Sequence, residues 1–186
     1  VIGFGGRVFK QENSEVAKYI NTPQTLIYNK SNILYGLDSA RLAVRKQNSC
    51  VVTEGYTDVI MAHQAGFDNT VAASGTALTA GHLNILKRYS ENLVLAFDMD
   101  VAGDSATQRG INAAQEQGFN IKVITNYQKD TDPADIITQD PKEWEQLISQ
   151  GRSIMDYYFY SAFSRFDKNN PEGKKEIGKI ILPAIK

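Results

Sequence analysis

The sequence is poor in residues that cross-link proteins or bind zinc: it has one cysteine, Cys50, and two histidines among 186 residues. A single cysteine excludes an internal disulfide framework and a zinc ribbon within this piece. His63 and His82 fall in predicted helices without a second metal ligand at zinc spacing, so we expect both to be structural. The composition predicts a reduced protein with no zinc in this fragment.

Long apolar runs are also missing from the sequence. No stretch of about 18 apolar residues is present, so we expect no membrane-spanning helix and no membrane partner, and no signal peptide is visible. The single cysteine suits a cytoplasmic protein, and because the chain starts at Val1 rather than Met we treat it as a fragment. With 42% hydrophobic residues it can bury a substantial core, and we expect one domain with appendages.

The formal net charge of −1 hides an uneven distribution of charge along the chain. Residues 1–50 contain seven Lys and Arg against three Asp and Glu, residues 51–140 contain five against twelve, and residues 141–186 contain eight against six. A metal site that lies beside a binding surface for a polyanion needs acidic residues at the site and basic residues around it, and this distribution fits that need. Ordinary surface variation is the competing explanation.

Short apolar runs alternate with helical periodicity in the centre of the chain. This alternation predicts repeated β-α units, and hence an α/β fold with a mainly parallel sheet flanked by helices. The predicted strands are 50–54, 69–73, 93–97 and 121–124, and the predicted helices between them are 58–65, 80–89 and 103–116. We expect a small mixed subdomain at 1–48, a central domain at 49–140 and a helical segment at 141–186.

Local patterns in the basic N-terminal part predict a turn and a helix. Residues 19–23 favour a turn, because Asn21 suits turns and Pro23 pushes the residue before it out of helical geometry. The apolar spacing of residues 34–47, with Leu42 among the apolar positions, predicts a helix.

Helix starts and a buried stripe are predicted further along the chain. Thr79 is expected to cap a helix, and the acidic turn at 129–135 is expected to lead into a helix that starts at Asp132 or Pro133. The tail shows helical spacing of apolar and aromatic residues, which we expect to be core, with docking on a further domain as the alternative. These residues are Trp144, Leu147, Ile148, Ile154, Met155, Tyr158, Phe159, Phe163 and Phe166.

Carboxylates appear where two of the predicted strands end. Glu54 follows the strand that begins at Cys50, and Asp98 and Asp100 follow the strand that ends at Phe97. Because central parallel strands deliver their carboxyl ends to one edge of an open sheet, we expect these three side chains to converge there. Converging carboxylates repel one another unless a cation neutralises them, and hard oxygen ligands suit Mg²⁺. The pattern predicts a Mg²⁺ site that handles phosphates.

Six motifs carry a resemblance to a known family. They are residues 1–7 (VIGFGGR), 18–23 (KYINTP), 34–37 (LYGL), 54–58 (EGYTD), the Gly-Thr loop at 75–76 and 98–103 (DMDVAG). They occur in the same order as in bacterial DnaG-type DNA primase, and the chain resembles the Toprim catalytic part of that family's RNA polymerase domain over essentially its whole length. The resemblance implies a Toprim domain at 49–140.

The resemblance also implies a reaction. The family is a DNA-directed RNA polymerase, a nucleotidyltransferase that synthesises short RNA primers from nucleoside triphosphates on a single-stranded DNA template. Such transfer needs metal to activate the attacking hydroxyl and to neutralise charge on the leaving pyrophosphate. We therefore expect Mg²⁺ as cofactor, with Mn²⁺ as a substitute.

The family's acidic motifs imply roles for particular residues. By this match, Glu54 is a metal ligand or general base, and Asp98 and Asp100 are catalytic metal ligands. Asp132 matches another metal-binding aspartate. Asp58 matches a further acid of the first motif, and helix capping is its alternative role.

The third acidic motif departs from the family pattern. The family usually has Asp-Pro-Asp, whereas here Asp132 and Pro133 are followed by Ala134 and only then by Asp135. In one interpretation, Asp135 replaces the missing metal ligand from one residue further on, which in a helical turn rotates its side chain by about 100° from the position of residue 134. The alternative is that Asp135 is an ordinary acid in the first turn of a helix.

The resemblance implies a nucleic-acid track and further partners. Arg7, Lys18, Asn21 and Lys30 fall on positions that resemble the family's basic track for single-stranded template, although each alone also suits a solubilising surface role. The replicative helicase is implied as a partner through a C-terminal domain missing from this chain. The implied location is the nucleoid at the replication fork, and the fragment alone is expected to be weakly active or inactive.

Three alternatives remain open from the residues. Another Toprim enzyme, a topoisomerase or nuclease, would share Glu54, Asp98 and Asp100. A haloacid-dehalogenase-like phosphatase would use Asp98 as a phosphorylated nucleophile, although that strand normally opens its domain. A Toprim scaffold that only binds DNA would have no evident use for so many clustered acids.

Overall fold

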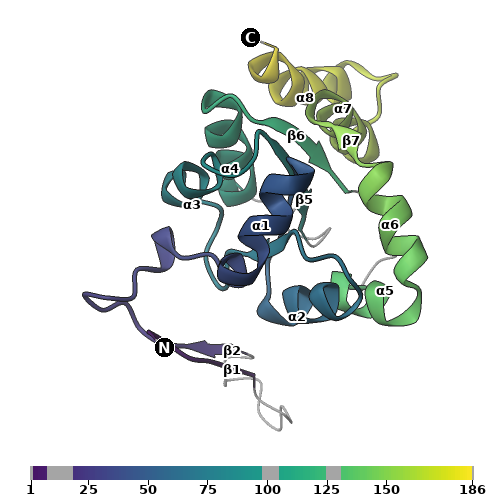
Figure 1. The fold of residues 1–186 in the computed structure, drawn as a ribbon. Helices are drawn as coiled ribbons and strands as arrows, with labels where there is room; N and C mark the ends of the chain where they lie inside the picture. The colour runs from purple at the N-terminus through teal and green to yellow at the C-terminus, as the bar shows by residue number, and fades with distance from the viewer. Residues whose placement is uncertain (1, 8–18, 98–104, 125–130, 186) are drawn as a thin grey trace, which may run out of the picture.

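The structure, a computed structural model, describes residues 2–7, 19–97, 105–124 and 131–185. Within these ranges it contains a five-stranded sheet covered by helices on both faces and a separate two-stranded hairpin near the N-terminus (Figure 1). The strands of the large sheet are β3 (Cys50–Thr53), β4 (Thr70–Ala72), β5 (Asn92–Ala96), β6 (Asn120–Val123) and β7 (Arg152–Ser153). The predicted α/β fold with a mainly parallel sheet is confirmed.

The order of the strands in the sheet is β4-β3-β5-β6-β7. The first four are parallel to their neighbours, and β7 runs antiparallel to β6. From β3 the chain moves to β4 on one side and then returns to β5 on the other, so the direction of winding changes between β3 and β5. In open α/β sheets, ligands bind outside the carboxyl ends of the strands at such a switch point.

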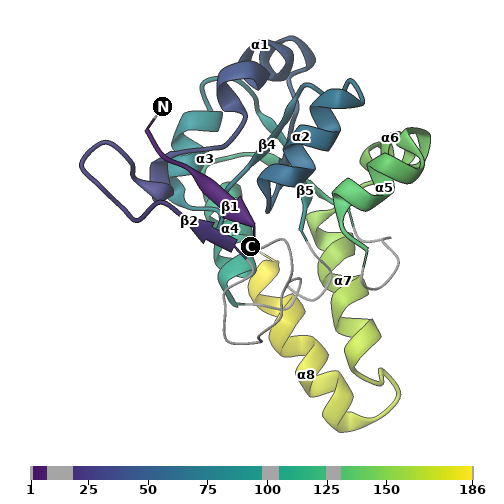
Figure 2. The same cartoon turned by 90° about the horizontal axis from the view of Figure 1, so that it is seen from below.

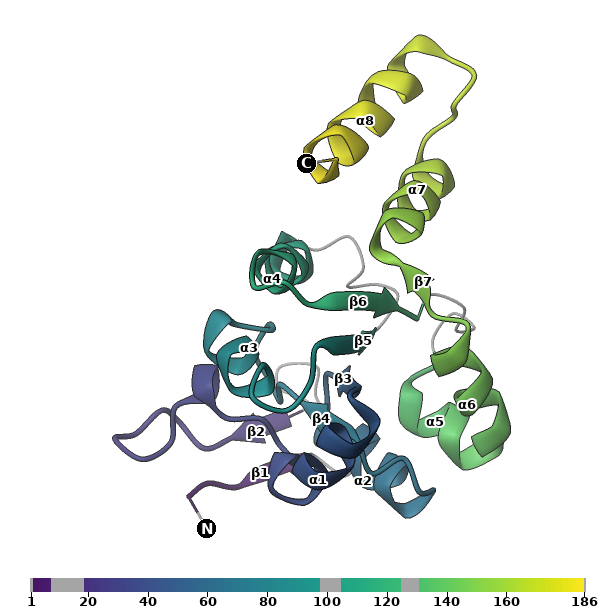
Figure 3. The ribbon, with the colours of Figure 1, turned by 45° about the horizontal axis from the view of Figure 1, so that its top comes forward.

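Helices cover the two faces of the sheet in separate groups (Figure 3). One face is covered by α1 (Leu37–Gln47), α3 (Ala80–Leu86), α4 (Ser105–Glu116) and α7 (Ile154–Arg165). The other face is covered by α2 (Tyr56–Gln64), α5 (Pro133–Gln139) and α6 (Pro141–Ser149). No helix in the described ranges has both the length and the apolar character needed to cross a membrane.

Alternation along the strands produces these two buried layers. Val52 packs with α1 and α3, whereas the neighbouring Val51 packs with α2 and α6, and both are fully buried. Successive side chains of a strand point to opposite faces, and a parallel strand covered on both sides is therefore apolar at every position. This explains why β3 and β5 could be recognised as short continuous apolar runs.

The helical tail is only partly core. Trp144 is fully buried on α6, and Tyr158 is buried against the sheet. Phe159 and Phe163 are 38% and 49% exposed on α7, so the prediction that the whole aromatic stripe is core is wrong at these two positions. The last helix, α8 (Pro171–Ile181), packs on α7 around Ala162 and extends away from the sheet, and the short 3₁₀ helix η2 (Leu182–Ala184) follows it (Figure 2).

Two further local predictions are wrong in the N-terminal part. Residues 19–21 form a strand, β2 (Tyr19–Asn21), rather than a turn, because they pair antiparallel with β1 (Gly5–Arg7). Leu42 is 74% exposed on α1, whose buried residues are Ala40 and Val44. The sequence pattern also gave no indication of β7, which has no apolar residue.

Candidate active site

The end of β3 places Glu54 at the carboxyl edge of the sheet. Glu54 directly follows Thr53, whose register partner on β5 is Ala96. The Glu54 carbonyl accepts a hydrogen bond of 3.0 Å from the backbone N–H of Ser74, so β3 and β4 remain paired beyond their last residues. The Glu54 side chain is half-buried at the switch point.

Asp58 stabilises the start of the helix that follows Glu54. Gly55 is the N-cap of α2, and its backbone N–H donates to Asp58 Oδ2 over 3.0 Å. Asp58 is only 5% exposed. This is the reciprocal half of a capping box, in which an acid three residues after the cap satisfies the cap's N–H. The capping role of Asp58 is confirmed, and its role as a metal ligand stays a prediction.

The loop after β4 has an uncommon backbone conformation. Ser74 and Gly75 both have positive φ, +47° and +82°. A left-handed conformation is routine for glycine but costs a serine free energy. The Ser74 hydroxyl is buried and has no hydrogen-bond partner among the described residues. The predicted loop at this position is confirmed, but nothing in the sequence indicated a left-handed serine.

The N-terminal hairpin contacts this loop through Asn21. A Cβ added to Gly75 would lie 2.7 Å from Asn21 Nδ2, and one added to Gly5 would lie 2.9 Å from Asn21 Oδ1. The amide of Asn21 therefore lies between two glycine α-carbons, which only the absence of side chains permits. Of the two predicted nucleic-acid residues whose side chains the structure describes, Asn21 and Lys30, Asn21 lies at the loop beside Glu54.

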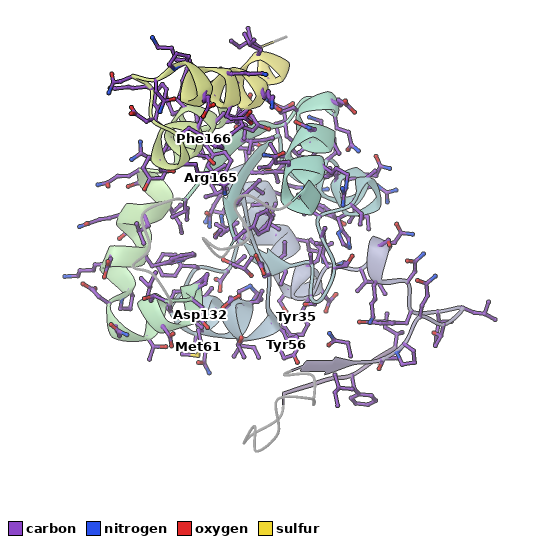
Figure 4. All side chains as sticks on the ribbon, turned by 180° about the vertical axis from the view of Figure 1, so that it is seen from behind. Tyr35, Tyr56, Met61, Asp132, Arg165 and Phe166 are labelled. Atoms are coloured by element: carbon purple, nitrogen blue, oxygen red, sulfur yellow. The ribbon has the colours of Figure 1, made fainter. Side chains whose placement is uncertain are left out.

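The side chain of Tyr56 contacts β1, the first strand of the hairpin. A Cβ on Gly5 would also lie 2.9 Å from Tyr56 Cε1, so the ring packs directly on the β1 backbone. The rings of Tyr35 and Tyr56 have centroids 5.8 Å apart, and Figure 4 shows them beside each other above the hairpin. No pattern in the sequence identified Tyr56 as a partner of the glycine-rich segment at 3–6.

Asp132 begins the helix that follows the predicted acidic turn. It is the N-cap of α5, and its Oδ1 accepts a hydrogen bond of 2.8 Å from the backbone N–H of Asp135. Pro133 occupies the first helical position, where its missing N–H is not needed. The predicted helix start is confirmed, and Asp135 lies in the first turn, where a helix N-terminus favours an acid.

An open pocket of about 260 Å³ lies between α2 and α5. Asp132 and Asp135 line it together with Thr57 and Met61, and Figure 4 shows Asp132 and Met61 close to each other. Thr57 is three residues after Glu54, so the pocket connects the start of α2 with the start of α5. The structure thus brings Asp132 to the same side of the molecule as the end of β3.

Several predicted site residues cannot be placed. Asp98, Asp100 and Lys18 lie outside the described residues, and for Arg7 the structure gives the backbone, which pairs with Tyr19. In the described part of the chain, no group of three or more His, Cys, Asp or Glu side chains has the arrangement of a metal site. The predicted metal site therefore stays a prediction.

Lys30 begins a short 3₁₀ helix, η1 (Lys30–Asn32), which lies against α3. Its carbonyl accepts a hydrogen bond of 2.7 Å from His82 Nε2. Burial lowers the pKa of His82, and backbone hydrogen bonds at Lys30 and Ile33 offset part of that effect. His63 Nε2 in turn lies 2.9 Å from the Thr70 carbonyl. Both histidines make backbone hydrogen bonds, as expected of structural residues.

Other buried titratable groups lie within the apolar core. Burial raises the pKa of the Cys50 thiol far above its ordinary value and that of the Tyr157 hydroxyl to about 12. Burial also raises the pKa of Tyr158. All three groups stay neutral near neutral pH, so none of them supplies an ionised nucleophile.

Two family models match the chain. Residues 51–137 match a model described as Toprim-like, and residues 1–41 match one described as DNA primase catalytic core, N-terminal domain. The first match contains Glu54, Asp132 and the switch point, and the second contains the hairpin and Lys30.

Curated relatives share sequence over nearly the whole chain. The DNA primase of Helicobacter pylori is 44% identical over 100% of the chain and 33% of the relative. That of Clostridium acetobutylicum is 38% identical over 97% of the chain and 30% of the relative. The chain therefore spans about a third of the length of these relatives.

Solved structures share the fold. A DnaG primase catalytic domain bound to single-stranded DNA matches with a TM-score of 0.79 and 30% identity over 98% of this chain and 59% of that one. The RNA polymerase domain of Mycobacterium tuberculosis primase matches with a TM-score of 0.81 and 28% identity over 100% and 62%. The chain belongs to the family of bacterial DnaG-type DNA primases and is similar to the Toprim-containing part of their catalytic core.

Proposed function

We propose that this chain forms the nucleotidyl-transfer part of a primase, which extends a short RNA primer from nucleoside triphosphates on a single-stranded DNA template. The observation that carries the proposal is the switch point between β3 and β5. Glu54 follows one of these strands, and in the sequence Asp98 and Asp100 follow the other. Acids that follow two neighbouring strands would then meet at the edge where such folds bind phosphate ligands.

The carboxylates at this edge suit a magnesium ion. Glu54, Asp98 and Asp100 would hold it, with Asp132 as a further ligand. Oxygen donors of this kind fit Mg²⁺, and Mn²⁺ accepts the same ligands. When bound, the metal would lower the pKa of the attacking hydroxyl and neutralise charge on the leaving pyrophosphate. Glu54, half-buried beside the switch point, is either one of the ligands or the base that takes the proton.

The basic N-terminal part is proposed to bind the template. Arg7, Lys18 and Lys30 would bind phosphates, and Asn21 would contact the backbone or a base. The position of Asn21 against Gly75 supports this assignment, because template bound there would pass beside Glu54. Asp58 and Asp135 contribute as helix-cap and first-turn acids, and as metal ligands only if the ion reaches them.

The other functions considered from the sequence have less support. The matches to DNA primases over both the N-terminal part and the Toprim-like part favour primase over a topoisomerase, a nuclease or a phosphatase. They also favour an enzyme over a scaffold. Engagement of the replicative helicase is proposed only for a protein that also carries the C-terminal domain implied by the resemblance, and this chain spans 30% of the Clostridium acetobutylicum relative.

Metal and nucleotide titrations test the proposed site. Thermal unfolding is followed with Mn²⁺, with ATP and with both, in the wild type, Glu54→Gln and Asp98→Ala. We expect Mn²⁺ to raise the melting temperature of the wild type and to strengthen ATP binding, because a ligand that binds only the folded state stabilises it. Asp98→Ala should lose the metal effect while staying folded.

The matched control is Asp140→Asn. Asp140 caps α6 and is exposed, so the variant keeps the cap and removes one negative charge outside the site. It should respond to Mn²⁺ as the wild type does. If Mn²⁺ leaves the wild type unchanged, or stabilises Asp98→Ala equally, the proposed metal site is wrong and the DNA-binding scaffold is the better explanation.

A further inference from the structure

His82 uses one ring nitrogen at the start of its own helix and the other to bond a residue 52 positions earlier in the chain. It is fully buried at the third position of α3. Its Nδ1 accepts a hydrogen bond of 3.3 Å from the backbone N–H of Thr79, and its Nε2 donates over 2.7 Å to the carbonyl of Lys30. Because the Lys30 carbonyl can only accept and the Thr79 N–H can only donate, the proton is on Nε2, Nδ1 carries none, and the ring is neutral.

Two more contacts hold η1 against the start of α3. Thr79 Oγ1 donates to the Ser31 carbonyl over 2.6 Å. A Cβ on Gly81 would lie 2.5 Å from the same carbonyl oxygen, so the two backbones are in direct contact. Figures 1, 2 and 3 agree in placing the short helix that carries Lys30 beside α3.

We propose that His82 is a positioning residue for nucleic-acid binding, which fixes the backbone of Lys30 relative to the sheet and thereby directs the Lys30 ammonium toward the template. The inference rests on the proposed function in one respect, namely that Lys30 contacts template phosphate. His82 itself is buried and does not touch nucleic acid.

The hydrogen bonds explain why this position needs a histidine. The Asn29 side chain caps η1 by accepting from the Ser31 N–H, which stabilises the start of this short helix. The short helix is oriented only if it is also attached to the body of the protein. The imidazole does this while satisfying the Thr79 N–H within the capping box. A lysine on a fixed backbone loses less conformational entropy when it binds a phosphate.

Two conservative variants separate the two functions of the ring. Asn places its amide oxygen three bonds from Cα, as Nδ1 is, so His82→Asn keeps the acceptor for Thr79 and loses the donor to Lys30. Gln places its amide nitrogen four bonds from Cα, as Nε2 is, so His82→Gln keeps the donor and loses the acceptor. A residue with a merely structural role would respond alike to both changes.

Binding is measured by fluorescence anisotropy with labelled oligothymidylate of about 16 nucleotides over a range of NaCl concentrations, well below the lowest melting temperature. We expect His82→Asn and Lys30→Ala each to weaken binding about fivefold and to reduce the slope of log affinity against log salt by about 0.7, the value for one phosphate contact on a single strand. His82→Gln should stay within about twofold of the wild type.

A double variant and an independent substitution complete the test. In the Lys30→Ala background, His82→Asn should cause no further loss, since it acts through Lys30. Gly81→Ala, which improves helix propensity but displaces η1, should reproduce the loss caused by His82→Asn. His63→Gln is the matched control, because His63 bonds a carbonyl within its own part of the fold and should leave binding unchanged.

The outcomes distinguish this inference from the proposed function. If Lys30→Ala leaves binding unchanged, the template contact of Lys30 is wrong. If Lys30→Ala weakens binding but the Asn and Gln variants of His82 behave alike, or if the loss in His82→Asn persists in the Lys30→Ala background, the positioning role of His82 is overturned while the template contact stands.

Discussion

The central sheet and the N-terminal hairpin are held in place by different interactions. In β3, Val51 and Val52 are fully buried between two layers of helices. In the hairpin, Phe4 and Ile20 are 78% and 63% exposed, and the strands are attached through glycine contacts to Asn21 and Tyr56. Burial of apolar surface stabilises the first region, and close backbone contacts orient the second.

This difference matches the proposed roles of the two regions, which are metal binding at the edge of the sheet and template binding at the N-terminal part. Metal ligands must be held at fixed distances, which suits the end of a strand in a packed core. A template must move through its site, which suits a segment held by a few polar contacts. We therefore expect substitutions in the sheet to change mainly the stability of the protein, and substitutions at the attachment of the N-terminal part to change its orientation.

The largest effect is expected in the sheet. Leu95 is fully buried in β5, and Leu95→Ala should lower the free energy of unfolding by about 3 kcal/mol through lost burial and a cavity. Urea denaturation measures the change. Leu42→Ala is the control, because Leu42 is 74% exposed and its truncation should cost less than about 0.5 kcal/mol. Equal losses in the two variants would contradict the view that the sheet supplies most of the stability.

An intermediate effect is expected at Gly36, where the N-terminal segment enters α1. Gly36 has φ +81°, and a Cβ there would lie 2.6 Å from Val59 Cγ1. Gly36→Ala combines a strained backbone with a clash and should cost about 2 kcal/mol. Gly66 has a similar φ of +90° but open space around it, so Gly66→Ala should cost only about 1 kcal/mol. Chemical denaturation compares the pair, and a smaller loss at Gly36 would show that Val59 moves aside freely.

The smallest of the three effects is expected from acid. Burial lowers the pKa of folded His82, whereas the unfolded residue has a pKa of about 6.5, so the unfolded state binds more protons as the pH falls. The contribution of His82 to stability is full above about pH 6.5 and decreases below it. Hydrogen bonding at Lys30 and Ile33 opposes the shift and limits its size.

Urea midpoints at about pH 7.5 and about pH 5.5 measure this dependence. His82→Gln should reduce the difference between the two midpoints. Because all carboxylates are common to the two proteins, the comparison isolates the imidazole of His82. Equal pH dependence in the wild type and His82→Gln would mean that His82 does not resist protonation in the folded state.

The parts of the fold that depend on burial could be predicted from the sequence. Apolar runs located β3 and β5, and Thr79 and Asp132 marked two helix starts, because these signals are local. The segment at 19–21 has local turn chemistry, but pairing with β1 overrides it. The two residues of β7 form a strand only because Lys122 and Val123 pair with them.

The candidate site was predictable where it depends on strand ends. Glu54 could be placed at the carboxyl edge because it follows an apolar run, and the acidic turn with its proline located a helix start at Asp132. The contact between Asn21 and Gly75, and that between His82 and Lys30, join residues more than 50 positions apart. No local pattern encodes such contacts, since they arise from the packing of one element against another.

Both margins of the large sheet are closed to strand addition. On one side, Ala72 of β4 exchanges two backbone hydrogen bonds, of 2.8 Å and 3.1 Å, with Tyr35. On the other, the antiparallel β7 pairs with β6 for two residues and then turns directly into α7. An exposed edge strand is a template on which another chain can form β-structure, and short or covered edges prevent this. The mainly apolar strands of this sheet are thereby shielded at these edges from pairing with another chain.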